Sequence, residues 1–508
     1  VVLCYRFHPE LTQATLLLGI IGTVHRVYIC NFMPSSGSSA LASDTQHKYL
    51  SPHHALHGQV QSSLSKRFVR SKASPARFSA PARLVVKASV MGQKQSTTAS
   101  LPSVYKSGIG QKLPYEEHDS CVYLDYNATT PIYPEVTEAM IPYIGRHFGN
   151  PSSGHAFGRP CAATISTARG QLAEMINSDP EEIVFTSCGS ESDNWAIVGP
   201  LAAARERLGA GVVPHVVTSN IEHPAIIEHL KAESSEGRLT FTEVPVNDQG
   251  LLDPSDVKAA MTPATYLVTV MHSNNEIGTL QPIKAIADVA HAGGALMHTD
   301  AAQSCGKVPV RTDLTGADLI TLVGHKFGAP KGVAALYVKK GTSLTRLFNG
   351  GGQERGLRAG TENVALIAAL GRAAQIVNEE GGEVMAHMGE MRDLLQSKIT
   401  ARLEGTEVKI NGPEDPSLKL PNTLSISIKG LQAAQLLNQL GDRMAASAGA
   451  ACHSAGGPSV SSVLKAIQLP VDFAVGTLRL STGRHTTPQD IETAAKLITD
   501  FVKNTAKA

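Results

Sequence analysis

The strongest constraint on the fold of this chain is the alternation of short apolar runs with helix-like stretches from about residue 121 onward. The runs end at polar or Gly-containing turns, which is typical of buried strands. The expected strands are residues 182–186, 215–219, 265–271, 295–299, 319–323 and 333–338. Helix-like stretches such as 159–176, 225–230 and 283–291 separate them. This alternation predicts an α/β fold with a mostly parallel sheet that helices cover on both faces.

The composition allows a large core and excludes several classes of partner. Of the 508 residues, 42% are hydrophobic and 18% are charged, so more than one domain is expected. Lys plus Arg (45) nearly balance Asp plus Glu (44), which gives no reason to expect binding to nucleic acid or to a membrane. The seven cysteines show neither CxxC nor zinc-site spacing. A reducing compartment and no metal are therefore expected.

The chain divides into three parts. Residues 1–118 are expected to be a disordered, transit-peptide-like extension, because 33–100 is basic and Ser-rich with Asp44 as its only acid. Small residues and Pro favour a plastid over a mitochondrion; without a transit peptide, the protein would be cytosolic. Residues 119–381 carry the alternation and predict a large domain. Residues 382–508, with a helix expected over 383–403, predict a smaller α+β domain.

Two expected strands end in residues that suit one cofactor. Asp300 follows the run 296–299, and Lys326 comes shortly after 319–323. Ligands of parallel sheets bind beyond the carboxyl ends of the strands, so this acid and this amine should lie close together. Pyridoxal phosphate needs a lysine for a Schiff base and a carboxylate beside its pyridinium nitrogen. Either residue alone would more often be a helix cap or a surface residue.

Further polar residues are expected at the same edge of the sheet. Gly189 and Ser190 follow a strand and enter a helix, where backbone N–H groups and a hydroxyl can hold a phosphate. His223 can stack on a planar ring and move protons. Asn275 and Gln303 offer amide donors to a phenolate oxygen. Taken singly, each motif is more often structural.

The C-terminal part adds an arginine and a thiol. Arg479 can bind a substrate carboxylate in a bidentate fork. Cys452 lies in a stretch, 448–458, that is too rich in Gly, Ala and Ser to pack a core, which predicts a mobile loop. Free cysteines are usually inert packing residues, but the adjacent His453 favours a thiolate when it is protonated. A mobile thiol beside an electron-sink cofactor can accept a departing sulfur or selenium atom, or protonate it.

From Tyr123 to the C-terminus the chain resembles the class V, fold-type I pyridoxal-phosphate enzymes, specifically the cysteine desulfurase and selenocysteine lyase group. The motifs that carry the resemblance are 124–131, 149–153, 190–192, 222–223, 274–276, 298–303, 324–326 and the thiol loop. The resemblance implies a large domain with a mostly parallel seven-stranded sheet, a smaller α+β C-terminal domain, pyridoxal 5′-phosphate as cofactor, and a homodimer.

The resemblance also implies roles for individual residues. The catalytic residues would be Lys326 as the Schiff-base lysine, His223 as the acid/base and Cys452 as the chalcogen acceptor. Arg479 and Asn150 would bind the substrate carboxylate. The remaining cofactor-binding residues would be Asp300, Gln303, Asn275, Gly189, Ser190, His325 and, from a partner subunit, Thr361.

The expected substrate depends on one departure from the family pattern. Cysteine desulfurases of this group typically carry Ser where this chain has Val323, and selenocysteine lyases resemble this chain there. We therefore expect a lyase that converts L-selenocysteine, or L-cysteine, into L-alanine and selenide or an enzyme-bound persulfide. The alternative is a cysteine desulfurase that passes sulfur to an acceptor protein for iron–sulfur assembly. A class V aminotransferase and an inactive scaffold are weaker alternatives.

Overall fold

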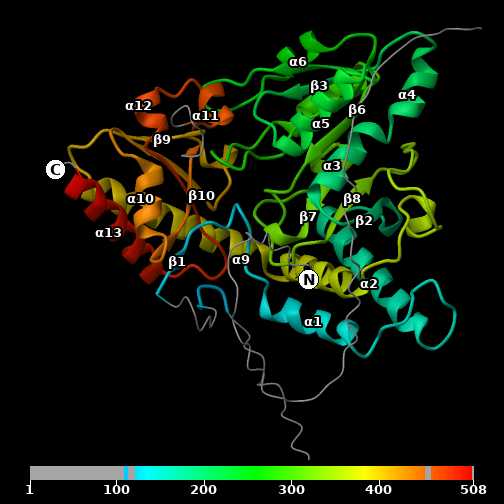
Figure 1. Cartoon of the computed structure of the whole chain (residues 1–508), viewed down its shortest axis with the longest axis horizontal. Helices are drawn as coiled ribbons and strands as arrows, with labels where there is room; N and C mark the ends of the chain where they lie inside the picture. The colour runs from blue at the N-terminus through cyan, green and yellow to red at the C-terminus, as the bar shows by residue number, and fades with distance from the viewer. Residues whose placement is uncertain (1–107, 113–119, 452–458, 506–508) are drawn as a thin grey trace, which may run out of the picture. The chain divides into compact units, whose positions relative to one another are not determined.

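The structure, a computed structural model, describes residues 108–112, 120–451 and 459–505 (Figure 1). Nearly all of the N-terminal extension and all of segment 452–458 lie outside the described residues. The expected transit peptide and the placement of Cys452 therefore stay predictions. Within the described parts of the chain, no helix combines the length and the apolar character that a membrane crossing requires.

A seven-stranded sheet forms the centre of the larger part of the molecule, in the order β2-β8-β7-β6-β5-β3-β4. Within it, β8 pairs antiparallel with β2 and β7, and the remaining neighbours are parallel. The expected α/β fold with a mostly parallel seven-stranded sheet is confirmed. The strands are β2 (Ile183–Thr186), β3 (His215–Ser219), β4 (Thr240–Val244), β5 (Thr265–Thr269), β6 (Leu296–Asp300), β7 (Leu319–Val323) and β8 (Ala334–Val338).

Helices cover both faces of this sheet because successive side chains of a strand point to opposite sides. In β3, Val216 packs in the core formed with α3 (Gly189–Val198), α4 (Leu201–Leu208) and α5 (Pro224–Ser235). The next residue, Val217, packs in the core on the other face. The helices that contribute to this core include α2 (Gly158–Ile176), α6 (Pro254–Ala260), α7 (Ile283–Ala292) and the first half of α9 (Val364–Arg402).

A second sheet lies in the C-terminal part, where β12 (Ser447–Ala448), β15 (Thr477–Ser481), β10 (Thr423–Ile428) and β9 (Val408–Ile410) pair antiparallel in this order. Its core includes the second half of α9, α10 (Ala433–Leu440) and α13 (Pro488–Thr505). The N-terminal strand β1 (Val122–Tyr123) pairs with β11 (Met444–Ala445) and joins this core through Val122 and Leu124.

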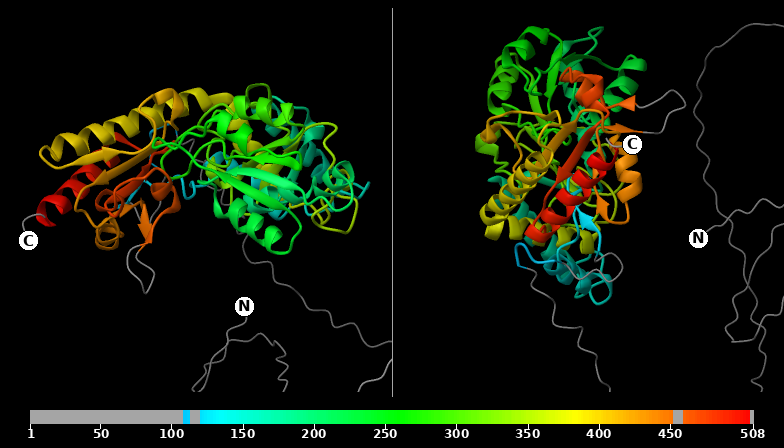
Figure 2. Two further views of the ribbon diagram at one scale, coloured as in Figure 1. Left: turned by 90° about the horizontal axis from the view of Figure 1, so that it is seen from above. Right: turned by 90° about the vertical axis from the view of Figure 1, so that its left-hand side faces the viewer.

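One helix, α9, connects the two parts (Figure 2). The sequence predicted a helix only over 383–403, whereas α9 begins at Val364, capped by the Asn363 side chain, which accepts from Leu366 N. Gly381 and Gly382 lie inside it without ending it. The expected boundary between 381 and 382 falls within this helix, and the division into domains stays a prediction. The remaining α-helices and strands of the described residues are α1 (Pro134–Ile144), α8 (Thr312–Thr315), α11 (Ser462–Ala466), α12 (Val471–Ala474), β13 (Ala450–Ala451) and β14 (Ser459–Val460).

Candidate active site

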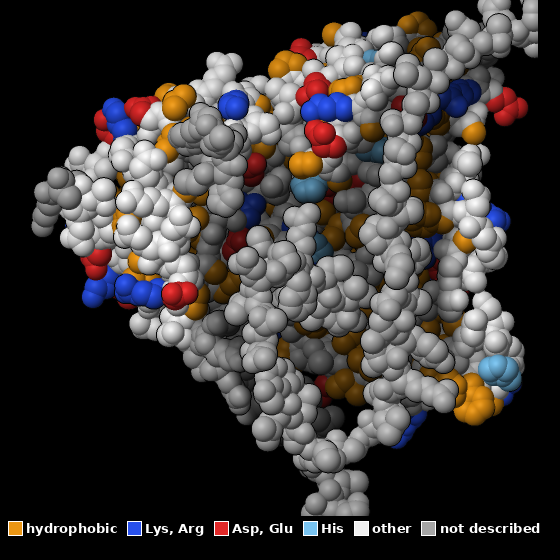
Figure 3. All heavy atoms as spheres, viewed as in Figure 1, with side chains coloured by type: hydrophobic (Ala, Val, Ile, Leu, Met, Phe, Trp, Pro, Cys, Tyr) orange, Lys and Arg blue, Asp and Glu red, His pale blue; other side chains and the backbone are white. Residues whose placement is uncertain are grey.

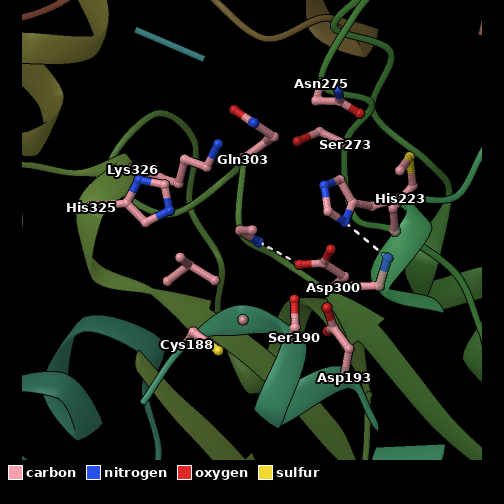
Figure 4. A pocket seen from close by; sticks show the side chains of 15 residues that line it. Cys188, Ser190, Asp193, His223, Ser273, Asn275, Asp300, Gln303, His325 and Lys326 are labelled. Carbon is pink, nitrogen blue, oxygen red and sulfur yellow. Dashed lines mark hydrogen bonds between the residues drawn. The ribbon is translucent and has the colours of Figure 1, made fainter. Parts of the chain in front are cut away.

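A pocket of about 240 Å³ lies beyond the carboxyl ends of the parallel strands. Figure 3 shows histidine and charged side chains gathered in a hollow near the centre of the face that it views. Figure 4 shows how the side chains of the pocket converge. The lining residues are Cys188, Gly189, Ser190, Asp193, His223, Ala225, Met271, Ser273, Asn275, Asp300, Ala302, Gln303, Val323, His325 and Lys326. The pocket thus brings together most of the residues that the sequence predicted.

Lys326 reaches this pocket from the short 3-10 turn Gly324–Lys326 that follows β7. Its Nζ donates to the backbone oxygens of Asn127 (2.6 Å) and Ala128 (2.9 Å). Burial, and after it the nearby Arg479 guanidinium, lower the pKa of Lys326 to about 8. An amine with this pKa is largely available as a nucleophile in mildly alkaline solution.

Asp300 is the last residue of β6 and is buried. One of its carboxylate oxygens accepts from Ala302 N at 2.8 Å. Burial raises the pKa of Asp300, while His223 and Lys326 act in the opposite direction. A cation bound beside this carboxylate would offset the cost of removing its negative charge from water.

A second buried acid, Asp193, lies next to Asp300 and was not predicted from the sequence. Burial, followed by the Asp300 charge, raises the pKa of Asp193 well above its usual range. Its Oδ1 has no hydrogen-bond partner among the described residues. Because Asp193 lies three residues after Ser190 in α3, helical spacing places the two on one face, and this signal could have identified it.

His223 caps the N-terminus of α5 and faces the pocket. Its Nδ1 accepts from Ala225 N at 3.1 Å, which leaves the proton of the neutral ring on Nε2. Desolvation lowers the pKa of His223. His325 lies against Thr129 Oγ1 (3.1 Å through Nδ1), and desolvation lowers its pKa to about 4. Both imidazoles are therefore neutral at neutral pH.

The N-terminus of α3 forms a cradle at one end of the pocket. Gly189 is the first residue of this helix, and Cys188, in an extended conformation, precedes it. A Cβ atom built on Gly189 would lie 2.8 Å from Cγ2 of Val323, closer than real Cβ contacts come. The absence of a side chain at Gly189 thus leaves room for Val323 to line this end of the pocket. Ser190 adds a hydroxyl beside the free N–H groups, which suits an anion.

Other predicted residues lie near the pocket or away from it. Arg479 does not line it; its guanidinium donates to Asp125 Oδ1 (2.8 Å), Ser447 Oγ (2.8 Å) and Asn275 O (3.2 Å). Asn150 and Thr361 are exposed and are not among the lining residues. Cys452 lies outside the described residues.

Asn127 is the most important contact residue that sequence reasoning left without a role. It is 1% exposed, and its backbone oxygen accepts from both Lys326 Nζ and Gln303 Nε2 (2.8 Å). It lies within the motif 124–131, which the sequence singled out without assigning it a function. Among the described residues, no group of His, Cys, Asp or Glu side chains is placed to hold a metal ion.

Comparison with known proteins supplies a family for this geometry. A model of the family described as aminotransferase class-V matches residues 122–493. The chain is 41% identical over 383 residues to cysteine desulfurase IscS of Clostridium botulinum, which covers 75% of this chain and 94% of that protein. It is 40% identical over 385 residues to a cysteine desulfurase of Trichormus azollae, covering 76% and 93%. A solved structure titled NifS-like protein matches 75% of this chain and 99% of its own, with 33% identity and a TM-score of 0.68.

Proposed function

The chain belongs to the class-V aminotransferase family, and we propose that within this family it is a cysteine desulfurase that removes sulfur from L-cysteine and releases L-alanine. The observation that carries the proposal is the pocket in which Lys326, with its lowered pKa, lies beside buried Asp300 and His223. The relatives named cysteine desulfurase support sulfur as the transferred element. These relatives favour the cysteine desulfurase, which the sequence suggested only as an alternative, over the selenocysteine lyase that it led us to expect.

Pyridoxal phosphate is the cofactor of this family, and the pocket fits it. Lys326 supplies an amine for the aldehyde, and Asp300 supplies a buried carboxylate for the ring nitrogen. The α3 cradle, which a Cβ on Gly189 would crowd, supplies room and N–H donors for the phosphate. Gln303 and Asn275 line the pocket with amide groups for the phenolate oxygen.

When bound, pyridoxal phosphate draws electrons from the amino acid, so that first the α-proton and then the sulfur can leave. Lys326 Nζ would take and return the α-proton of the substrate. Asp300 keeps a proton on the ring nitrogen because an ion pair there offsets the burial of its charge. His223 is neutral and presents a ring that can hold or deliver a proton.

Arg479 is proposed to bind the substrate carboxylate. Its Nε has no hydrogen-bond partner among the described residues, although its terminal nitrogens bind Asp125 and Ser447. The proximity of Arg479 also contributes to the lowered pKa of Lys326, which places its charge close to the amine. A carboxylate brought between them would pair with this cation.

Cys452 is proposed to accept the sulfur as a persulfide. The described backbone on either side of its segment, β13 and β14, pairs antiparallel. The thiol attacks the substrate sulfur, the carbon–sulfur bond breaks with its electrons remaining on the carbon side, and protonation of that carbon completes alanine. A thiol or protein acceptor then reduces the persulfide.

Thr361 and Asn150 are exposed in the single chain, and we propose that a second copy brings Thr361 to the neighbouring pocket. Beside Asn150, the exposed rings of Phe148 and Phe157 (72% and 61% exposed, centroids 5.4 Å apart) form an apolar surface that a homodimer would cover. Sedimentation of the active protein as a monomer would contradict this. Organelle import remains a further proposal, tested by fusing residues 1–118 to a fluorescent protein.

Selenocysteine lyase is retained as the second candidate because Val323, rather than Ser, lines the pocket. The purified protein is incubated with L-cysteine or L-selenocysteine, and alanine, sulfide and selenide are measured, with K326A as the control. The proposal predicts alanine and persulfide from L-cysteine. Turnover of L-selenocysteine alone would replace it by the second candidate, and no turnover of either amino acid would contradict both.

A further inference from the structure

Lys307 is a buried lysine that lies behind the pocket and has no role in the chemistry proposed above. It is 3% exposed, and its Nζ donates to Gln303 Oε1 (2.9 Å) and to Asn127 Oδ1 (3.0 Å). Both acceptors are neutral amides. Burial lowers the pKa of Lys307 well below its usual range. Because an amine is costly to bury, its position beside these two amides indicates that its donors matter there.

The contact with Lys307 helps to fix which way the Gln303 amide faces. Gln303 Oε1 accepts from Lys307, and Gln303 Nε2 donates to Asn127 O at 2.8 Å. A primary amide has two N–H donors, so one remains for the pocket that Gln303 lines. With its oxygen bound to Lys307, the amide presents a donor to the pocket rather than an acceptor.

The two amides differ in how much they depend on Lys307. Asn127 Oδ1 also accepts from Asn422 Nδ2 (3.0 Å), and Asn127 Nδ2 donates to Thr423 Oγ1 (2.8 Å). These contacts hold the Asn127 side chain from two further directions. The Gln303 amide is held by two contacts, one from Lys307 to its oxygen and one from its Nε2 to Asn127 O. Removal of the lysine leaves the amide oxygen without a donor and only the second contact to hold the amide in this orientation.

We propose that Lys307 is a positioning residue that holds the Gln303 amide so that its N–H donates to the phenolate oxygen of pyridoxal phosphate. The inference rests on the proposed function, which places the phenolate oxygen at Gln303. Without Lys307 the amide oxygen can face the phenolate oxygen, and two acceptors then repel each other. The charged or ionisable groups whose fields reach Lys307 are Lys326, Arg479 and Cys305, and none of them changes in the test below.

The test follows the visible absorbance of the bound cofactor as a function of pH. A hydrogen-bond donor to the phenolate oxygen makes it a poorer base, so the proton it shares with the Lys326 nitrogen is lost at a lower pH. Lys307→Met should therefore move the midpoint of the absorbance change upward by about one pH unit, the effect of losing one hydrogen bond to a charged group. Gln303→Ala should move it in the same direction.

The decisive variant combines the two substitutions. If Lys307 acts through Gln303, adding Lys307→Met to Gln303→Ala moves the midpoint no further. The matched control is Lys419→Met, since Lys419 is also buried (8% exposed) and donates to a neutral oxygen, Asn411 O, but does not line the pocket. This control should lower stability and leave the midpoint unchanged.

Two results would overturn the inference. The first is a midpoint for Lys307→Met equal to that of the wild type. The second is an undiminished shift when Lys307→Met is added to Gln303→Ala, which would show a direct effect of the Lys307 charge. If the Met variant fails to fold, Lys307→Gln enters the same cycle and should give a smaller upward shift that Gln303→Ala abolishes. A wild-type protein that binds no cofactor would refute the proposed function as well. A wild type that binds it and forms alanine, without the coupled shift, would refute only the role of Lys307.

Discussion

Substitution of Gly189 by Ala tests whether the α3 cradle is shaped by the contact with Val323. The backbone at Gly189 does not have the positive φ that would exclude a side chain, so the first effect of Ala is favourable. Ala is more stable than Gly in a helix by up to about 1 kcal/mol. The added Cβ would, however, lie 2.8 Å from Val323 Cγ2, and Val323 is 4% exposed at the end of β7. Overpacking of this kind costs about 1–3 kcal/mol, so the clash should win.

We expect Gly189→Ala to lower the free energy of unfolding by up to about 2 kcal/mol, the difference between these two effects. A displaced α3 N-terminus should also raise the Kd for pyridoxal phosphate, by about tenfold for each 1.4 kcal/mol of binding lost. Denaturant unfolding of the apoprotein measures the first quantity, and titration of the apoprotein with cofactor measures the second.

The cause is isolated by repeating the substitution in a Val323→Ala background. There the methyl group that Cβ meets is absent, so Gly189→Ala should become neutral or stabilising, with a coupling energy of about 1–3 kcal/mol. Gly170→Ala in α2 is the matched control, since a Cβ on Gly170 meets nothing within 4 Å. It should stabilise the protein. Equal effects of Gly189→Ala in both backgrounds would refute the steric argument.

Three further predictions concern the buried ion pair between Arg169 and Glu354 beside β2, and the ionisable groups of the pocket. Arg169 donates to buried Glu354 at 2.7 and 2.9 Å. Arg169→Met leaves this carboxylate without its cation and should lower the free energy of unfolding by about 3–5 kcal/mol. An unchanged midpoint of denaturant unfolding would contradict this. The deprotonated amine of Lys326 is the form that reacts with the cofactor. The rate of cofactor uptake by the apoprotein should therefore rise about tenfold per pH unit below about pH 8 and level off above it. Stopped-flow absorbance measures this rate, and a flat pH profile would be inconsistent with the prediction. Asp193→Asn should change alanine formation little, because burial and the Asp300 charge both disfavour the ionised form of Asp193, and Asn resembles the neutral form. Asp300→Asn should reduce alanine formation by about 100-fold or more, and similar losses in both variants would show that the two acids were assigned wrongly.

The strand–helix alternation was enough to predict the large sheet, because its strands are short, apolar and mostly buried on both faces. The exception was β4 (Thr240–Val244), an edge strand whose residues are mostly half-buried or exposed, so that its apolar signal is weak. The antiparallel direction of β8 and the pairing of β1 with β11 could not be predicted, since both depend on contacts between residues far apart in the sequence.

The site was predictable where a residue lies at the end of a strand or in the turn that follows it. Asp300, Lys326, His223 and Gln303 line one pocket, as expected from the rule that parallel sheets bind ligands at their carboxyl ends, and their functional roles stay predictions. Lys307 was not predicted, because its position behind the wall depends on three-dimensional packing rather than on a motif.

The most direct test of the proposed function is the release of alanine from L-cysteine by the purified protein with pyridoxal phosphate and without any keto acid. Quantitative amino-acid analysis of the wild type and of K326A gives the answer. The proposal predicts that the wild type forms alanine in amounts equal to the sulfur released, and that K326A forms none while remaining folded. A wild-type protein that binds the cofactor but forms no alanine, or alanine formation that survives the loss of Lys326, would contradict it.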